Sequence, residues 1–255
     1  MLLAIDVGNT QTVVGLYDGE SLSEHWRTAS VRSQTADELA VELHGLLAVR
    51  GRTFADISAT VASSGVPQLA EALRETAWSH FGHEALIVGP GVRTGLELRV
   101  DNPHEVGADR VANCVAALAL QPGPLVVVDF GTAINFDAVS ADGAFVGGAI
   151  APGLEVAVNA LGERAARLFR IELKAPEHAI GRNTAENMQS GAILGYAGLV
   201  DGLVRRFAAE LGGDVGVIAT GGLAAVVTPH CETVDRVEPW LTLEGLRLIW
   251  ERNRV

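Results

Sequence analysis

The sequence predicts an α/β protein built of two similar halves, chiefly because one motif occurs twice. Residues 2–20, LLAIDVGNTQTVVGLYDGE, run from an apolar segment into Asp6 and a turn, then through a second apolar segment to Asp-Gly. Residues 125–143, LVVVDFGTAINFDAVSADG, repeat this order around Asp129. Asp-Gly between alternating strands is a strong hairpin signal, and internal similarity indicates a repeated unit. Strands that alternate with helices elsewhere favour α/β layers.

The first half is predicted to begin with a meander of three strands within residues 2–28. Turns are expected at Gly8–Thr10 and at Asp18–Gly19, because Gly, Asn and Asp are common turn residues. Helix and strand signals then alternate. The expected elements are a helix after the capping-box residue Thr35, a strand in ISATVASS, a helix from Pro67 to Gly82, a strand in EALIVG, and a helix in DNPHEVGADRVANCVAALAL with Asn102 as a possible cap.

The second half is predicted to begin at Leu125 and to follow the same plan. The expected elements are a hairpin after Asp129, a strand in FVGGAI, a helix after Pro152–Gly153, a long helix from about Thr184 towards Gly212, a strand in DVGVIATGG and a last helix over about 242–252. Because no linker or low-complexity segment separates the halves, we expect two adjoining domains, residues 1–122 and 123–255.

Composition narrows the class of protein. The chain has 255 residues, of which 48% are hydrophobic and 20% charged, as is typical of a soluble globular protein. The net charge of −12 argues against nucleic acid or a membrane surface as a partner. The N-terminus has no basic segment before its short apolar run, so a cytoplasmic location is expected. Cys114 and Cys231 form neither a metal-ligand spacing nor a disulfide framework, which favours two buried thiols in a reducing compartment.

Lysine is almost absent, and this restricts how phosphate could be bound. Lys174 is the only lysine, and it lies in RIELKAPE without a preceding glycine loop. The chain therefore lacks a Walker A lysine, and it also lacks a G-x-G-x-x-G motif. A phosphate site would have to use backbone N–H groups, hydroxyls, arginines and metal ions.

The two acidic turns are candidates for such a site. A carboxylate at the end of a strand can hold a divalent cation, and the N–H groups and hydroxyls of a turn can hold phosphate oxygens. Gly8 and Gly131 would allow the backbone to come close to a ligand. Two such turns in two similar halves could grip a triphosphate from both sides. The alternative is a pair of ordinary hairpin turns.

Two further segments admit either a functional or a structural interpretation. In ATGG, residues 219–222, two glycines after a buried strand could lie flat against a planar ligand, although such pairs are usually turns. Asp109 and Arg110 are neighbours, so both can serve one site only if a helix begins near Gly107. There Asp109 could accept a proton and Arg110 could bind a carboxylate. The alternative is an acidic residue that stabilises the helix N-terminus.

A set of segments carries a family resemblance. The chain contains, in this order, DVGNT at 6–10, NPHEVGADR at 102–110, VVVDFGTA at 126–133, GGAIAPG at 147–153, GRNT at 181–184 and ATGG at 219–222. Together they resemble the type III pantothenate kinases, which belong to the acetate kinase/sugar kinase/Hsp70/actin superfamily. The resemblance covers nearly the whole chain. It implies two ribonuclease-H-like halves, each a mixed sheet with flanking helices, and a nucleotide cleft between them.

The resemblance also implies roles for the nucleotide-binding residues. Asp6 matches the Mg²⁺-associated aspartate, and Asp129 matches the ligand of a monovalent cation, K⁺ or NH₄⁺. The positions that match contacts to ATP are Asp6, Val7, Gly8, Asn9, Thr10, Thr132, Gly221 and Gly222.

The substrate residues follow in the same way. Asp109 matches the catalytic base, and the pantothenate pocket matches Gly107, Ala108, Asp109, Arg110 and Thr184. The family places this pocket at the interface of a homodimer. Many members have a tyrosine before the DNP segment where this chain has Val100, and this difference bears on the shape of the pocket.

The expected activity is therefore the ATP-dependent phosphorylation of pantothenate to 4′-phosphopantothenate, the first step of coenzyme A biosynthesis. Two alternatives are a kinase of another small hydroxyl substrate on the same fold and a non-catalytic relative that acts as an accessory regulatory factor. The GADR segment argues against the first alternative. The presence of Asp6, Asp109 and Asp129 argues against the second.

Overall fold

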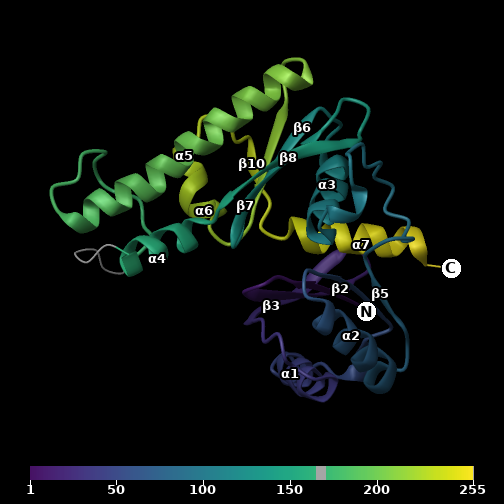
Figure 1. Cartoon of the computed structure of the whole chain (residues 1–255). Helices are drawn as coiled ribbons and strands as arrows, with labels where there is room; N and C mark the ends of the chain where they lie inside the picture. Colours follow the sequence, from purple (N-terminus) through teal and green to yellow (C-terminus); the bar gives the residue numbers. More distant parts are fainter. Residues whose placement is uncertain (165–170, 255) are drawn as a thin grey trace. The chain divides into compact units, whose positions relative to one another are not determined.

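A computed structural model describes residues 1–164 and 171–254 of the chain. It contains two five-stranded sheets (Figure 1). The first sheet consists of β1 (Leu2–Val7), β2 (Gln11–Asp18), β3 (Ser21–Ala29), β4 (Ala59–Ser64) and β5 (Ala85–Ile87). The second consists of β6 (Leu125–Phe130), β7 (Ala133–Val139), β8 (Phe145–Pro152), β9 (Gly216–Thr220) and β10 (Arg236–Val237).

The two sheets have the same topology. Their strand orders are β3-β2-β1-β4-β5 and β8-β7-β6-β9-β10. In each sheet the first three strands form an antiparallel meander, and the fourth strand lies parallel to the first. A shift of register interrupts each outer hairpin, between Leu16 and Tyr17 in one sheet and between Ala138 and Val139 in the other. The prediction of an α/β fold with two similar halves is confirmed.

Two compact units enclose these sheets. Unit 1 comprises Met1–Gly95, Asn102–Ala116 and Leu241–Val255, and unit 2 comprises Leu96–Asp101 and Ala117–Trp240. The expected boundary between residues 122 and 123 separates the strands of the two sheets. The compact units differ from it in three places, because unit 2 includes residues 96–101 and 117–122 and unit 1 includes residues 241–255. The last helix belongs to unit 1, because it packs against β1, β2 and β4.

Helices cover both faces of the first sheet. Helix α1 (Ala36–Ala48) begins with the predicted Thr35–Glu38 capping box. Helix α2 (Pro67–Thr76) continues into a π-helical turn, Ala77–Phe81, that ends at Gly82 with a φ of 75°. Their leucines pack with Leu3, Ile5 and Val7 of β1 in one apolar core. Helix α7 (Leu241–Asn253) lies on the opposite side of this sheet (Figure 1).

A close helix crossing in unit 1 holds the first turns of α3 (Ala108–Leu120). A Cβ atom at Gly245 of α7 would lie 1.9 Å from the carbonyl oxygen of Ala112, so only glycine fits at the crossing. Beside it, Thr242 donates a hydrogen bond of 2.7 Å to the buried Asn113 side chain. The position of α3 in unit 1 is therefore fixed by α7.

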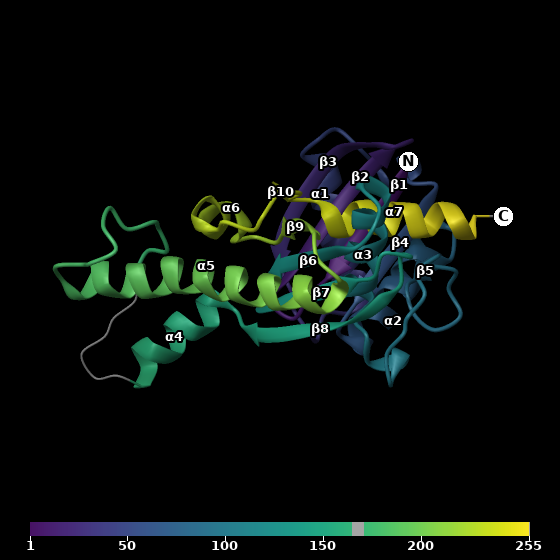
Figure 2. The same cartoon turned by 90° about the horizontal axis from the view of Figure 1, so that it is seen from above.

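In unit 2, the long helix α5 (Thr184–Leu211) packs against the second sheet through Ile193, Ala197 and Val200. Figures 1 and 2 both show α5 extending past the sheet, with α4 (Leu154–Arg164) beside it. The short helix α6 (Ala224–Val227) follows β9. Short 3-10 turns that the sequence patterns did not predict occur at Phe54–Asp56, Pro103–Glu105 and Thr228–His230.

Among the described residues, no helix is both long enough and apolar enough to cross a membrane.

Candidate active site

Both acidic turns lie where a central strand ends, as predicted. We call residues 6–10 loop A and residues 129–132 loop B. Asp6 lies opposite Ser63 in the parallel pair of β1 and β4, and the Ser63 hydroxyl donates a hydrogen bond of 2.6 Å to Asp6 Oδ1. Thus β4 supplies a polar partner that fixes one oxygen of the Asp6 carboxylate.

Backbone hydrogen bonds close loop A. The N–H of Gly8 donates to the carbonyl of Gln11 over 3.0 Å, and the N–H of Gly65 donates to the carbonyl of Val7 over 3.2 Å. A Cβ atom at Gly8 would lie only 2.9 Å from the Gln11 oxygen, so glycine permits this tight turn. Asn9 and Thr10 are exposed at its tip, whereas the Val7 side chain is buried and belongs to the core.

Two glycines, one in loop B and one after β9, lie beside the aspartate of loop B. Asp129 lies opposite Thr220 of β9 and Asn135 of β7. A Cβ atom at Gly221 would lie 2.6 Å from Asp129 Oδ1, and Gly221 has a φ of 96°. A Cβ atom at Gly131 would lie 3.8 Å from the same oxygen. Glycine at position 221 therefore lets the backbone after β9 pass close to the Asp129 carboxylate.

Thr132 is held in place by the turn that precedes α4. The N–H of Gly153 donates to the Thr132 carbonyl over 3.0 Å. A Cβ atom at Gly153 would lie 2.2 Å from that oxygen, so the close approach requires glycine. The Thr132 side chain is exposed. Loop B, Gly153 and Gly221 thus all belong to unit 2.

The donor sets fit small cations bound together with a ligand. Mg²⁺ is usually bound through one or two carboxylates plus substrate phosphates, and Asp6 is a half-buried carboxylate at the base of the loop A turn. Asp129 offers one carboxylate beside backbone that glycines bring close, a donor type that also suits a monovalent cation. Within residues 1–164 and 171–254, no group of three or more His, Cys, Asp or Glu residues is arranged to hold a metal ion alone.

Asp109 and Arg110 lie in the first turn of α3. This is the position in which the two neighbouring side chains could serve one site. The helix begins at Ala108, after the 3-10 turn Pro103–Glu105, so the segment that begins at Asn102 is not one continuous helix. The Asp109 carboxylate folds back over Gly107, where a Cβ atom would lie 2.3 Å from Oδ1. This geometry also suits a stabilising acidic residue at the helix N-terminus, so both interpretations of Asp109 fit its position.

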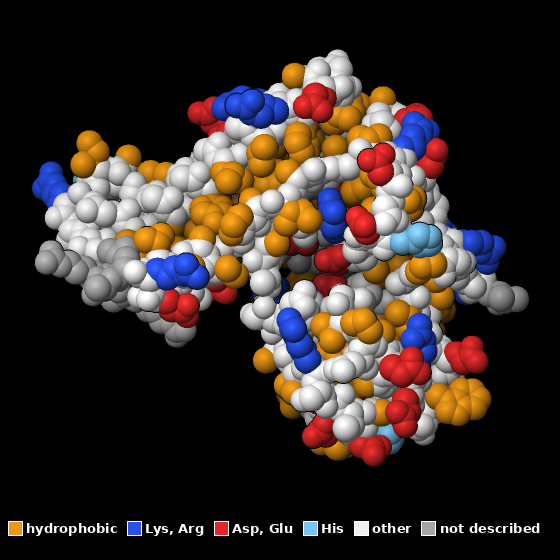
Figure 3. Space-filling model, in the orientation of Figure 1, with side chains coloured by type: hydrophobic (Ala, Val, Ile, Leu, Met, Phe, Trp, Pro, Cys, Tyr) orange, Lys and Arg blue, Asp and Glu red, His pale blue; other side chains and the backbone are white. Residues whose placement is uncertain are grey.

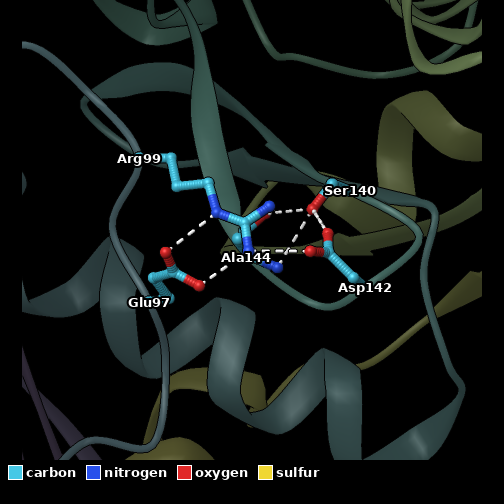
Figure 4. Close-up of polar contacts among 5 residues, drawn as sticks. All are labelled: Glu97, Arg99, Ser140, Asp142 and Ala144. Carbon is cyan, nitrogen blue, oxygen red and sulfur yellow. Dashed lines mark hydrogen bonds and ion pairs between the residues drawn. The ribbon is translucent and has the colours of Figure 1, made fainter.

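Val100 lies in a segment that an arginine fastens to the second sheet. Residues 97–99 pair with Phe145 through two backbone hydrogen bonds of 2.9 Å. Arg99 contacts both Glu97 and Asp142 at 2.7 Å (Figure 4). Hydrogen bonds from Arg99 and then Ser140 lower the pKa of Asp142 to about 2. The half-buried Val100 therefore follows directly after an anchored residue.

Thr184 is the first residue of α5, as predicted, but it does not cap the helix. Asn183 is the cap, and its side chain accepts a hydrogen bond of 2.9 Å from the N–H of Glu186. Glu186 in turn accepts a hydrogen bond of 2.7 Å from the Arg182 N–H. The exposed Thr184 side chain is thus not used in capping.

The structure divides the predicted residues between the two units. Unit 1 holds loop A and Gly107–Arg110, and unit 2 holds Val100, loop B, Thr184 and the Gly221–Gly222 turn. Sequence reasoning missed the partners of these residues, namely Ser63, Gly153 and Asn183. Asn183 could have been found from its position three residues before Glu186, whereas Ser63 is identified only by the β1–β4 register.

Comparisons with known proteins identify relatives of this chain. The chain is 53% identical over 261 residues to the type III pantothenate kinase of Streptomyces avermitilis, covering 99% of this chain and 98% of that one. It is 50% identical over 253 residues to the type III pantothenate kinase of Moorella thermoacetica, covering 99% of this chain and all of that one.

Solved structures with low sequence identity share the fold. Component A of the (R)-2-hydroxyglutaryl-CoA dehydratase of Acidaminococcus fermentans is 17% identical with a TM-score of 0.59, and each chain is covered to 99%. An inorganic polyphosphate/ATP-glucomannokinase from Arthrobacter sp. strain KM is 15% identical with a TM-score of 0.53, again over 99% of each chain. The family profile described as type III pantothenate kinase matches residues 2–206, and the chain therefore belongs to the type III pantothenate kinase family.

Proposed function

We propose that this protein transfers the γ-phosphoryl group of ATP to the 4′-hydroxyl of pantothenate, the first step of coenzyme A biosynthesis. The observation that carries the proposal is identity of 50% or more, over the full length, to proteins named for this activity. The two acidic loops and the Gly-Ala-Asp-Arg helix start support it. Because the reaction consumes ATP, we place the enzyme in the cytoplasm.

The nucleotide would be held by both loops. In our proposal the N–H groups and side chains of Gly8–Thr10 contact the phosphates, Thr132 provides a second phosphate contact, and Gly221 and Gly222 face the adenosine. Asp6 would hold Mg²⁺ together with the phosphates. The ion would reduce the negative charge on the oxygens that react.

Pantothenate would be held by the start of α3. Asp109 orients the 4′-hydroxyl and accepts its proton, and Arg110 binds the polar end of the substrate through paired hydrogen bonds. Gly107, Ala108, Val100 and Thr184 would line the pocket. With valine in place of the family's tyrosine at position 100, the pocket lacks that hydroxyl group.

A monovalent cation at Asp129 would supply positive potential that many phosphotransferases obtain from lysine. The only lysine, Lys174, lies 3.4 Å from Glu172 in unit 2. Phosphoryl transfer needs positive charge near the transferred oxygens. K⁺ or NH₄⁺ held by the Asp129 carboxylate would provide it.

A homodimer is the second part of the proposal. Four glycines of α5 line one face of the helix, and a Cβ atom at any of them would meet nothing within 4 Å: Gly191, Gly195, Gly198 and Gly202. The opposite face, which includes Ala197, packs in the core of unit 2. Figure 3 shows hydrophobic side chains over the region of α5 and β8, where Val146 and Ile150 are exposed. Small residues let two helices approach closely, and symmetric dimers are the commonest oligomers.

The dimer is tested by placing a charge on the open face of α5. Gly195→Glu should shift the sedimentation coefficient towards a 26.7 kDa monomer and abolish pantothenate binding. Gly45→Glu is the matched control, because Gly45 is also an exposed helical glycine with nothing within 4 Å. A wild-type protein that is fully active as a single chain would contradict the dimer.

The activity itself is tested by coupled detection of ADP with and without pantothenate, in K⁺ buffer with Mg²⁺. We expect ADP release to depend on pantothenate and the product to gain the mass of one phosphoryl group. A panel of other small alcohols would identify a different acceptor. Failure to release ADP with any acceptor would favour the accessory regulatory factor.

A further inference from the structure

An arginine outside every predicted motif contacts the tip of loop A. Arg32, in the connection between β3 and α1, donates a hydrogen bond of 3.1 Å to Asn9 Oδ1. The amide nitrogen of Asn9 points the other way and lies 3.9 Å from the Cβ position of Gly65. The Asn9 side chain therefore lies between the arginine and the turn after β4.

The connection that carries Arg32 is fixed at both ends. Ser30 donates its N–H to the Thr10 carbonyl over 3.0 Å, and the hydroxyls of Ser30 and Thr12 are 2.8 Å apart. At the other end, the N–H of Gln34 donates to the Val31 carbonyl, just before the capping box of α1. The position of Arg32 beside loop A thus follows from the backbone of the connection as well as from its own side chain.

The charge of Arg32 has no carboxylate partner among the described residues. Some exposed arginines of unit 1 pair with glutamates, such as Arg50 with Glu24 and Arg74 with Glu71, whereas Arg27 and Arg32 each donate to a side-chain amide. For Arg32, the structure records no ion pair with a carboxylate of the described residues, although the chain has a net charge of −12. A guanidinium has five N–H donors, and the bond to Asn9 uses one. The remaining donors are available to an anion bound at the exposed tip of loop A.

We infer that Arg32 is a further catalytic residue, whose guanidinium donates hydrogen bonds to the β- and γ-phosphate oxygens of ATP bound at loop A. Arginine suits this role because its planar fork matches phosphate geometry. Asn9 holds the fork over the loop before the nucleotide arrives. Arg32 then stabilises the charge that builds up on the transferred phosphoryl group, together with the cations. The inference rests on the proposed function for the identity of the bound anion.

The test compares Arg32→Gln with Arg27→Gln. Arg27 is a matched control, because it is an exposed arginine on β3 that donates a hydrogen bond of 3.4 Å to Gln11, just after loop A. We expect Arg32→Gln to lower kcat by about 10²-fold, the scale of losing one electrostatic donor. Its affinity for ATP, measured by calorimetry, should fall by about tenfold, while affinity for AMP stays unchanged because AMP lacks the β- and γ-phosphates.

The control and the conservative variant should behave differently. Arg27→Gln should keep kcat and ATP affinity within about twofold, as is usual for a surface substitution. Arg32→Lys keeps the charge but loses the fork, so it should recover part of the lost kcat. Circular dichroism should show all three variants folded, since both arginines are exposed.

Two results would overturn the inference. The first is an Arg32→Gln protein whose kcat and ATP affinity match those of Arg27→Gln. The second is an equal loss in both variants, which would indicate a general effect of net charge. ATP affinity is measured without an acceptor. If the wild type does not phosphorylate pantothenate but Arg32→Gln still loses ATP affinity, the proposed acceptor fails and the role of Arg32 stands.

Discussion

Loop A and loop B occupy the same place in two sheets of the same topology, yet their surroundings differ. Asp6 accepts a hydrogen bond from Ser63, and the tip of its loop is exposed beside Arg32. Asp129 instead lies between Gly131 and Gly221. The sheet thus determines where each carboxylate lies, and the neighbours determine what it can bind. We propose that loop A serves Mg²⁺ and phosphate, and loop B a monovalent cation.

The largest expected effect comes from removing the carboxylate of loop B. Asp129→Ala should lower kcat by about 10³-fold, because a cation that balances phosphoryl charge is lost, and the residual activity should no longer respond to K⁺. Asp6→Asn is the matched variant in loop A. It should also lose activity, but it should respond to K⁺ and need more Mg²⁺. If both variants show the same dependence on both ions, the two loops do not differ in function.

Asp109→Asn should give the next largest effect. Without a proton acceptor at the start of α3, kcat should fall by about 10²-fold, the usual scale for a positioned base. ATP affinity should stay close to that of the wild type, and the residual rate should still rise with K⁺, in contrast to Asp129→Ala. Steady-state kinetics and calorimetry measure these quantities. A kcat near the wild-type value would leave Asp109 as a helix-stabilising residue only.

A smaller effect concerns the glycine beside Asp129. Gly221→Ala forces a side chain into a left-handed backbone conformation and against Asp129 Oδ1 at 2.6 Å. We expect the free energy of unfolding to fall by about 3 kcal/mol, from backbone strain plus overpacking. Gly19→Ala is the control, since Gly19 has a φ of 61° but open space around its Cβ position. It should cost only about 1 kcal/mol. Equal losses in urea denaturation would mean that the space beside Asp129 is not tightly closed.

The last prediction concerns the rate at which an alkylating reagent modifies the thiol of Cys231, which lies in the same unit as loop B. Burial and then the charge of Asp201 raise the pKa of this thiol from 9.0 to about 11. A raised pKa leaves the thiol protonated below pH 9, so alkylation at pH 8 should be about 10²-fold slower than for a free cysteine. The rate should rise tenfold per pH unit up to about pH 11. Mass spectrometry of the labelled peptide measures this, and labelling at the free-cysteine rate would show that this part of unit 2 opens.

Features that depend on local sequence could be predicted well. Both loops, the capping box at Thr35 and the start of α5 at Thr184 follow from short patterns of apolar, acidic and glycine residues. The repeat of the aspartate turn also predicted the duplicated topology. Such signals work because turns and caps are stabilised by residues a few positions apart.

Features that depend on distant pairing could not be read from the sequence in this way. Gly221 lies beside Asp129 only because β9 pairs in parallel with β6, and Ser63 reaches Asp6 only because β4 pairs with β1. The last helix joins unit 1 because its apolar face packs against the first sheet. Arg32 lies in none of the sequence motifs, and we infer its role only from its hydrogen bond to Asn9.

A K⁺ titration of pantothenate-dependent ADP release by the wild type tests the proposed cation site of loop B most directly, at saturating Mg²⁺ and constant ionic strength, with Na⁺ as the replacement ion. We expect a rate that rises with K⁺ to a plateau and is much lower in Na⁺, because a site sized for the larger ion binds the smaller one poorly. Equal rates in K⁺ and in Na⁺ would contradict the proposed difference between loop B and loop A.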